Sequence, residues 1–291
     1  MTEISRMASK ALLVAATLPS ALAWGPLGHE TVALVATEFV LPETRAFFQE
    51  VLGDNSSTDY LAAVASWADD WKKTDEGAFS YNYHFIDALD EPPTSCNVDL
   101  ERDCGESGCV VSALANYTTH LVQSELNREE REIAAKLVIH FAGDIGQPLH
   151  CENLARGGND IAVTFDGEAT NLHSVWDYNI PEAITNGSTR ADAHAWAADL
   201  ITAIRAGPYR CKTRNWVAGL RVDDIEDVAL RWARESNEDV CTVVMPEGAE
   251  VLEVGDLGGE YAEGAKGTVK LQIAKQGYRL AKLLDAIAQA Q

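Results

Sequence analysis

Apolar residues recur at spacings of three and four along most of the chain, which is the period of an α-helix. In the segment 29–39, for example, Val32, Val35 and Phe39 fall on one face. Seven segments show this pattern strongly enough to predict helices: 29–39, 61–73, 110–125, 128–144, 191–205, 225–237 and 266–289.

One region departs from the helical period. Between Gly157 and Glu168 apolar and polar residues alternate, and Asp166-Gly167 is typical of a tight turn, so this region predicts a small β-hairpin. We find no internal repeat and no linker rich in proline, glycine or serine. The predicted fold class is therefore all-α, with one helical domain over residues 24–291 and a minor hairpin.

The first 23 residues have the pattern of a signal peptide. Arg6 and Lys10 precede the apolar run 11–18, which is too short to cross a membrane. Ala21-Leu22-Ala23 then supplies the small residues at which signal peptidase cuts. We expect residues 1–23 to be removed, the mature chain to begin at Trp24, and the protein to be secreted to the extracellular space.

Composition limits how such a protein can bind its partners. Hydrophobic residues make up 46% of the 291 residues, which is enough for a substantial core. The formal net charge is -22, and removal of residues 1–23, with one acidic and two basic side chains, leaves -23. This charge excludes nucleic-acid binding through a broad basic patch. If the substrate is a polyanion, metal ions must supply positive charge locally.

Six cysteines agree with an oxidising compartment, although their spacing does not determine the pairing. Cys104 and Cys109 are close enough to close a small loop, which Cys96 could tie to Cys241. The last two cysteines would form a third bridge or remain free thiols: Cys151 and Cys211. In a secreted chain, three triplets are candidate N-glycosylation sites, beginning at Asn55, Asn116 and Asn186.

Histidine and aspartate occur together in several short sequence motifs, called phrases below. His140 and Asp144 are four residues apart on a predicted helix, so both side chains project from one face. A proline then ends the helix, and His150 returns from the following loop; His173 and Asp177 repeat the spacing of four. Either residue of a pair alone is more often a core histidine or a helix cap. Together they indicate a chelating set of the kind that zinc takes in hydrolytic sites.

Three further phrases add donors. Of His84 and Asp87, one could bind a metal and the other orient it or contact substrate. Asp69 ends Ser-Trp-Ala-Asp, but the neighbouring Asp70 leaves that position ambiguous, and His29 alone is weak. All these donors are too many for one ion. A cluster of several zinc ions is typical of phosphoester hydrolysis.

Trp24 gains a role from the predicted cleavage. Its free α-amine and its own carbonyl oxygen could chelate a metal, with His29 completing the site, whereas before cleavage this nitrogen is an amide. The hypothesis is that signal cleavage completes one metal site; the alternative is that Trp24 is only the first core residue. His120 and His194 lack an acidic partner at ligand spacing and are expected to be ordinary.

In this order the phrases resemble one family, the secreted, single-strand-specific zinc nucleases of fungi and plants, also called type I nucleases. The resemblance covers almost the whole chain from Trp24 onward. It rests on Trp-Gly-x-Leu-Gly-His-Glu at 24–30, Trp-Ala-Asp at 67–69, His-Phe-Ile-Asp at 84–87, Gly-Asp-Ile-x-Gln-Pro-Leu-His at 143–150, Gly-Gly-Asn at 157–159 and Asn-Leu-His-x-x-Trp-Asp at 171–177.

The resemblance implies an all-α fold shared with bacterial zinc phospholipase C and three zinc ions per chain. It implies these ligands: Asp69, His84, His140 and Asp144 for the first zinc; His150, His173 and Asp177 for the second; Trp24 and His29 for the third, with Asp144 bridging the third to the first. It thereby favours Asp69 over Asp70.

The resemblance also implies the roles of residues that bind no metal. Lys72 would contact phosphate, Asp87 would lie close to the attacking water, and Phe85 and Asn159 would lie near a nucleobase pocket. The disulfides would be Cys96–Cys241 and Cys104–Cys109. The implied activity is hydrolysis of single-stranded DNA and RNA to 5′-phosphate products, with 3′-nucleotidase activity, by a monomer.

The chain departs from the family pattern at four positions. Gly146 stands where histidine is common, Cys151 stands where an acidic residue is usual, and Cys211 has no counterpart. A third bridge beside a zinc ligand would alter the rigidity of the site, and Arg156 would lie near the base pocket.

Two rival functions fit the same ligands. A phospholipase C-like enzyme would use the zinc cluster on lipid head groups, but a charge near -22 opposes docking on anionic membranes. A secreted zinc-binding protein without catalysis would not need Lys72 and Asp87, which favour an enzyme.

Overall fold

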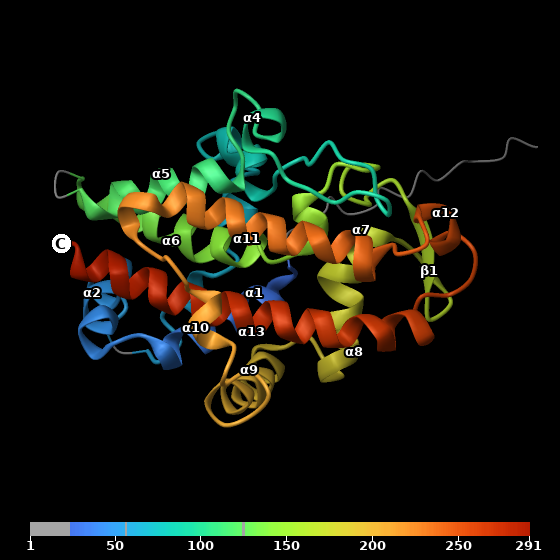
Figure 1. Ribbon diagram of the computed structural model, residues 1–291. Coiled ribbons are helices and arrows are strands. Elements are labelled where there is room, and N and C mark those ends of the chain that lie inside the picture. Colours follow the sequence, from blue (N-terminus) through green and yellow to red (C-terminus); the bar gives the residue numbers. More distant parts are fainter. Residues whose placement is uncertain (1–23, 56, 124–125) are drawn as a thin grey trace, which may run out of the picture.

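Local signals in the sequence set several helix ends in the computed structural model, which describes residues 24–55, 57–123 and 126–291 (Figure 1). The predicted signal peptide lies outside these residues. Helices α1 (Pro26–Phe39) and α2 (Pro42–Leu52) both begin at proline, whose missing N–H is not needed in the first turn. Helix α6 (Arg128–Asp144) begins with a capping box, in which Asn127 and Glu130 each accept the other's backbone N–H.

The other helical elements are the long helices α5, α9, α11 and α13 and the shorter helices and turns that surround them. In chain order they are η1 (Ala62–Val64), α3 (Trp67–Trp71), η2 (Ala78–His84), α4 (Leu100–Asp103), α5 (Val110–Val122), η3 (Pro148–Cys151), α7 (Leu172–Ser174), η4 (Val175–Asn179), α8 (Ile180–Thr185), α9 (Arg190–Arg205), α10 (Thr213–Trp216), η5 (Val222–Asp224), α11 (Ile225–Asp239), η6 (Val240–Val244), α12 (Ala249–Leu252) and α13 (Glu260–Gln289). The elements η4 and η6 are π-helical and the other η elements are 3₁₀ turns.

The one hairpin in the described residues joins strands β1 (Ala162–Phe165) and β2 (Glu168–Asn171), which pair antiparallel. The predicted hairpin is confirmed, but its position was partly wrong. Residues 157–160 form turns instead of a strand, and the second strand runs on to Asn171. Asp256 fastens the hairpin turn by accepting backbone N–H groups from Asp166 and Gly167.

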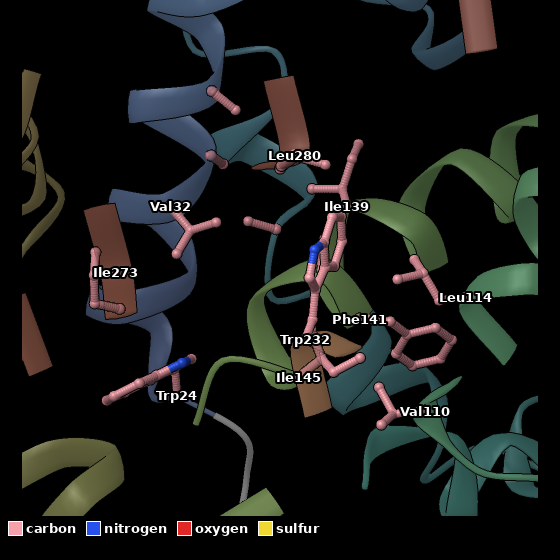
Figure 2. Packing of buried hydrophobic residues seen from close by; sticks show 14 of the residues in the cluster. Trp24, Val32, Val110, Leu114, Ile139, Phe141, Ile145, Trp232, Ile273 and Leu280 are labelled. Atoms are coloured by element: carbon pink, nitrogen blue, oxygen red, sulfur yellow. The ribbon is translucent and has the colours of Figure 1, made fainter. Parts of the chain in front are cut away.

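The core lies where the long helices meet. Helix α13 packs against α1, α6, α8 and α9, and α5 packs against both α6 and α11. Figure 1 shows α11 and α13 running along the length of the molecule, with the hairpin near one end. Figure 2 shows Val32, Ile139, Trp232 and Leu280, from four different helices, gathered in this interior. No helix among the described residues is both long and apolar enough to span a bilayer.

The predicted helix over 61–73 was wrong as a single element. The structure has the 3₁₀ turn η1, then a break, then the short helix α3. The backbone N–H of Asp69 binds the carbonyl of Ser66 and not that of Ala65, as an unbroken helix would require. The Ala65 carbonyl accepts instead from Nδ1 of His140, at 2.7 Å. The break therefore serves a buried histidine on α6.

Candidate metal centre

Helix α6 brings the first two donors together at its C-terminal end. His140 and Asp144 are both fully buried, and His140 Nε2 lies 3.2 Å from Asp144 Oδ2. This is the one-face arrangement that their spacing predicts.

Asp69 of α3 and His84 of η2 complete a compact set of four donor atoms with this pair. His84 Nδ1 lies 3.0 Å from both His140 Nε2 and Asp144 Oδ2. Asp69 Oδ1 lies 3.6 Å from His140 Nε2 and 3.7 Å from His84 Nδ1. Ligands at about 2.0 to 2.1 Å from a tetrahedral zinc ion are about 3.3 Å from one another. The donor atoms therefore have the spacing of a tetrahedral coordination shell.

A second set forms on the segments after α6. The sequence predicts that His150 lies in a loop. In the structure it lies in the 3₁₀ turn η3, because Pro148 begins a new helical turn. His173 Nε2 lies 3.2 Å from His150 Nε2 and 3.1 Å from Asp177 Oδ2. All three side chains are buried.

Asp144 also faces a third group of residues. Its Oδ1 lies 3.2 Å from His29 Nε2, whereas its Oδ2 faces the first set. Trp24 is fully buried at the start of α1, and the next residue, Gly25, donates its backbone N–H to the Asp177 carbonyl at 3.0 Å. The chain start, the second set and Asp144 thus converge on one region.

The donor set fits zinc because several of its buried atoms lack a hydrogen-bond partner. His29 Nε2, Asp144 Oδ1 and Asp177 Oδ2 are buried and make no hydrogen bond. A buried polar atom without a partner costs free energy, so this many together points to a ligand that they share. Neutral imidazole and carboxylate are the donors that zinc takes in hydrolytic sites.

Backbone carbonyls orient three of the histidines. Nδ1 of His140, His150 and His173 lies 2.7, 2.7 and 2.6 Å from the carbonyl oxygens of Ala65, His84 and Gly157, respectively. A donor N–H at Nδ1 leaves Nε2 with a free lone pair that points into the centre. Such outer contacts fix the tautomer and orientation of metal-binding histidines.

The electrostatics favour the ionised form of Asp69 and Asp144 and the neutral form of His29, His84 and His150. Although burial alone would raise it, the nearby His140 and Lys72 lower the pKa of Asp69 to about 2. Burial lowers the pKa of His84 to about 4 and also lowers that of His29 and His150, whereas, despite burial, the neighbouring aspartates raise the pKa of His140 and His173. An ionised carboxylate and a neutral imidazole are the forms that donate electron pairs to a metal, so metal binding at His140 and His173 competes with a proton.

Of the remaining predicted residues, Lys72 contacts the first donor set. Lys72 is buried, and its Nζ lies 2.9 Å from Asp69 Oδ1. Asp87 and Phe85 are half-buried beside His84 in sequence, and burial together with Asp103 raises the pKa of Asp87. Asn159 is half-buried and donates to the Arg156 carbonyl.

The structure separates the ambiguous pair of aspartates. Asp69 is buried in the first set, whereas the Asp70 side chain is 87% exposed and pairs with Lys73. The two histidines expected to be ordinary lie outside the donor sets: His120 contacts the ring of Tyr117, and the exposed His194 pairs with Asp59.

The cysteines form the two bridges implied by the resemblance, Cys96–Cys241 and Cys104–Cys109. The open alternative of a third bridge was wrong, because Cys151 is a buried free thiol and Cys211 an exposed one. The candidate glycosylation residues are all exposed: Asn55, Asn116 and Asn186.

Sequence reasoning missed several residues that support the donors. Gln147 donates from Nε2 to Asp177 Oδ1 at 2.8 Å. At Gly143, a Cβ atom would lie 2.8 Å from His29 Nδ1, so only glycine lets α6 approach that ring. Gly157 has a φ of +60°, a conformation that favours glycine, and it presents its carbonyl to His173. The Gly-Gly-Asn phrase was the available signal for the last of these.

Comparisons with known proteins agree on one family. Residues 24–289 match the S1/P1 Nuclease family. The chain is 48% identical to nuclease P1 of Penicillium citrinum, over 91% of this chain and 97% of that protein. It is 49% identical to nuclease S1 of Aspergillus oryzae (strain ATCC 42149 / RIB 40), over 91% and 92% of the two chains. Endonuclease 2 of Arabidopsis thaliana is 31% identical over 92% of each chain.

Among solved structures, an alpha-toxin of Clostridium perfringens aligns with a TM-score of 0.46 and 11% sequence identity. The alignment covers 94% of this chain and 66% of the toxin chain.

Proposed function

The chain belongs to the S1/P1 nuclease family, and on that basis we propose that it is a secreted, zinc-dependent endonuclease. Its substrates are single-stranded DNA and RNA, which it hydrolyses at phosphodiester bonds to give 5′-phosphate products. The same site removes the 3′-phosphate of mononucleotides. The observation that carries the proposal is the buried convergence of His and Asp donors at tetrahedral spacing.

Three zinc ions occupy the centre in this proposal. The first would be held by Asp69, His84, His140 and Asp144, the second by His150, His173 and Asp177, and the third by Trp24, His29 and Asp144. The close approach of the side-chain donors in each group supports these assignments. The two oxygens of Asp144 face different donor groups, which supports its bridging role. Bound zinc would act as a Lewis acid, lowering the pKa of a bound water and stabilising charge on phosphate and leaving oxygens.

Asp87 and Lys72 carry the protein's own part of the reaction. A carboxylate oxygen of Asp87 accepts a proton from the attacking water, a role favoured by its raised pKa and half-buried position. Lys72 Nζ donates to a phosphate oxygen and offsets the charge that gathers there. The ion pair between Lys72 and Asp69 places this cation at the edge of the first donor set.

Single-strand preference follows from how a base is bound. Phe85 and Asn159 bind one nucleobase, by ring stacking and by side-chain hydrogen bonds respectively. A base in a duplex must leave its stack to reach them, which costs a few kcal/mol, whereas an unpaired base is already accessible.

Maturation completes the third site. Removal of residues 1–23 would free the α-amine of Trp24, which would then hold zinc together with the Trp24 carbonyl and His29. Residues 24–291 then act as one domain, as a monomer. The two disulfides support passage through an oxidising compartment, and Asn55, Asn116 and Asn186 are exposed for glycosylation.

The test is hydrolysis of a single-stranded oligonucleotide by the purified mature protein, with and without a zinc chelator, beside the same sequence as a duplex. We expect cleavage that favours the single strand, stops on chelation and returns with added zinc. Analysis of the product ends should give 5′-phosphates. A fully zinc-loaded protein that cleaves neither substrate would refute the proposal.

A further inference from the structure

The exposed apolar side chains of this protein are unevenly distributed. Among the described residues, the large hydrophobic side chains that are exposed are Phe79, Tyr81, Leu89, Leu154, Val251 and Val254. The last two lie in and just after α12. The other four lie on two segments, 78–89 and 148–154, each of which also carries a histidine of the metal centre.

These two segments are bonded to each other. The backbone N–H of Ile86 donates to the His150 carbonyl at 2.8 Å, and that of Asn153 donates to the Ala88 carbonyl at 3.2 Å. The exposed apolar side chains therefore flank the donor sets on a continuous piece of structure. Exposed apolar residues scattered singly need no explanation, but four of these six lie on the two bonded segments that carry His84 and His150, which favours a binding surface there.

Two of the four side chains are aromatic, and their neighbours hold them. The Tyr81 ring meets that of Phe85 edge-on, with centroids 6.0 Å apart at 82°. The Phe79 ring meets that of Trp71 in the same way, at 5.4 Å and 86°. Phe79 remains 56% exposed and Tyr81 54% exposed. Each ring thus has an aromatic partner that positions it while more than half of the residue stays exposed, which suits a position where a base can stack.

The surrounding charges select the part of a nucleic acid that can bind here. The segment just before η2 exposes Asp75 and Glu76, and the one lysine near it that is exposed, Lys73, is paired with Asp70. Phosphate groups would be repelled by these carboxylates. A base is uncharged and can stack on an aromatic ring whatever its identity.

We propose that Tyr81 is a second base-stacking position, which binds a nucleotide next to the one bound at Phe85. This inference rests on the proposed nuclease function and deepens it. It implies that single strands long enough to reach Tyr81 bind better than mononucleotides, and that the gain comes from base stacking and not from phosphate contacts.

The test compares Tyr81→Ala with the wild-type zinc enzyme on two substrates, a 3′-mononucleotide and a single-stranded oligonucleotide. We expect kcat/KM on the oligonucleotide to fall about tenfold, mainly through KM, which is in the range for loss of one stacking partner. Activity on the mononucleotide should be unchanged. Tyr81→Trp should retain the wild-type values, and Val254→Ala is the control for loss of an exposed apolar side chain elsewhere.

An abasic substitution in the oligonucleotide identifies the bound base. Moved along the strand, it should lower kcat/KM at one position beyond the base bound at Phe85 in the wild type, and have no effect there in Tyr81→Ala. Equal losses on both substrates, or no loss on either, would overturn the inference while leaving the nuclease function intact. Failure of the zinc-loaded wild type to cleave any substrate would overturn both.

Discussion

Gln147 offers a direct test of how the second donor set is positioned. Its side chain is fully buried between α6 and η3. Its Nε2 donates to Asp177 Oδ1 at 2.8 Å, and its Oε1 accepts the backbone N–H of Leu149 at 2.6 Å. The first bond turns Asp177 so that Oδ2 faces His173 Nε2 at 3.1 Å. Replacing Gln147 with alanine removes this support without touching a proposed ligand.

The structure gives the size of the expected effect. In Gln147→Ala, the buried Asp177 Oδ1 loses its hydrogen-bond donor, which costs about 1 to 3 kcal/mol. Loss of a partner that orients a metal ligand lowers metal affinity about 10- to 100-fold, or about 1.4 to 2.8 kcal/mol, so the two ranges agree. We expect zinc in the second set to bind this much more weakly. Gln147→Glu should be worse, because it places two buried carboxylates in contact.

The assay is a zinc titration against a chromophoric chelator, which resolves the number of bound ions and their affinities. The matched control is Gln49→Ala. Gln49 lies in α2, and its Nε2 also donates a single hydrogen bond, to the Ser57 carbonyl, but it contacts no proposed ligand. One of three zinc ions should weaken in Gln147→Ala and none in the control. Unchanged affinities, or an equal loss at all three ions, would refute the reasoning.

Three further predictions follow from the site and the bridges. Asp144→Asn should lower the zinc content by more than one ion per chain and abolish cleavage, because the two carboxylate oxygens of Asp144 face different donor groups. Elemental analysis and the cleavage assay measure these effects, and full zinc content would contradict the bridging role. Replacing both Cys96 and Cys241 by serine should lower the free energy of unfolding by ~5 kcal/mol, since the disulfide closes a loop that spans 145 positions. Urea unfolding followed by tryptophan fluorescence checks this, and an unchanged unfolding midpoint would be the contrary result. With zinc chelated, the wild type should lose more stability than His84→Gln as pH drops from 6.5 toward 4. Burial lowers the pKa of His84 to about 4, so over this range the unfolded chain binds a proton at His84 that the folded chain does not. Thermal melts of both proteins across this range test it, with equal losses as the contrary result.

The long amphipathic helices could be predicted from the sequence because their signals are local. Helix α6 has the predicted bounds, since Asn127 caps its start and its apolar stripe continues to its end. Helix α13 begins earlier than predicted, and α2 was missed, although Pro42 and Gly53 mark its two ends. The break within 61–73 could not be predicted, because its cause is a bond from Ala65 to a histidine that lies 75 positions away.

Of the candidate site, the sequence by itself predicted the chelating pairs His140/Asp144 and His173/Asp177 from their spacing of four and indicated zinc chemistry. The full donor set came from the resemblance to a family, which favoured Asp69 over Asp70. Only the tertiary structure decided how these donors meet. It buried Asp69 and left Asp70 exposed to solvent, left Cys151 and Cys211 without a bridge, and left two aromatic side chains exposed on the element that carries His84. These outcomes depend on burial and on contacts between distant segments, and neither is recorded in the spacing of residues along the chain.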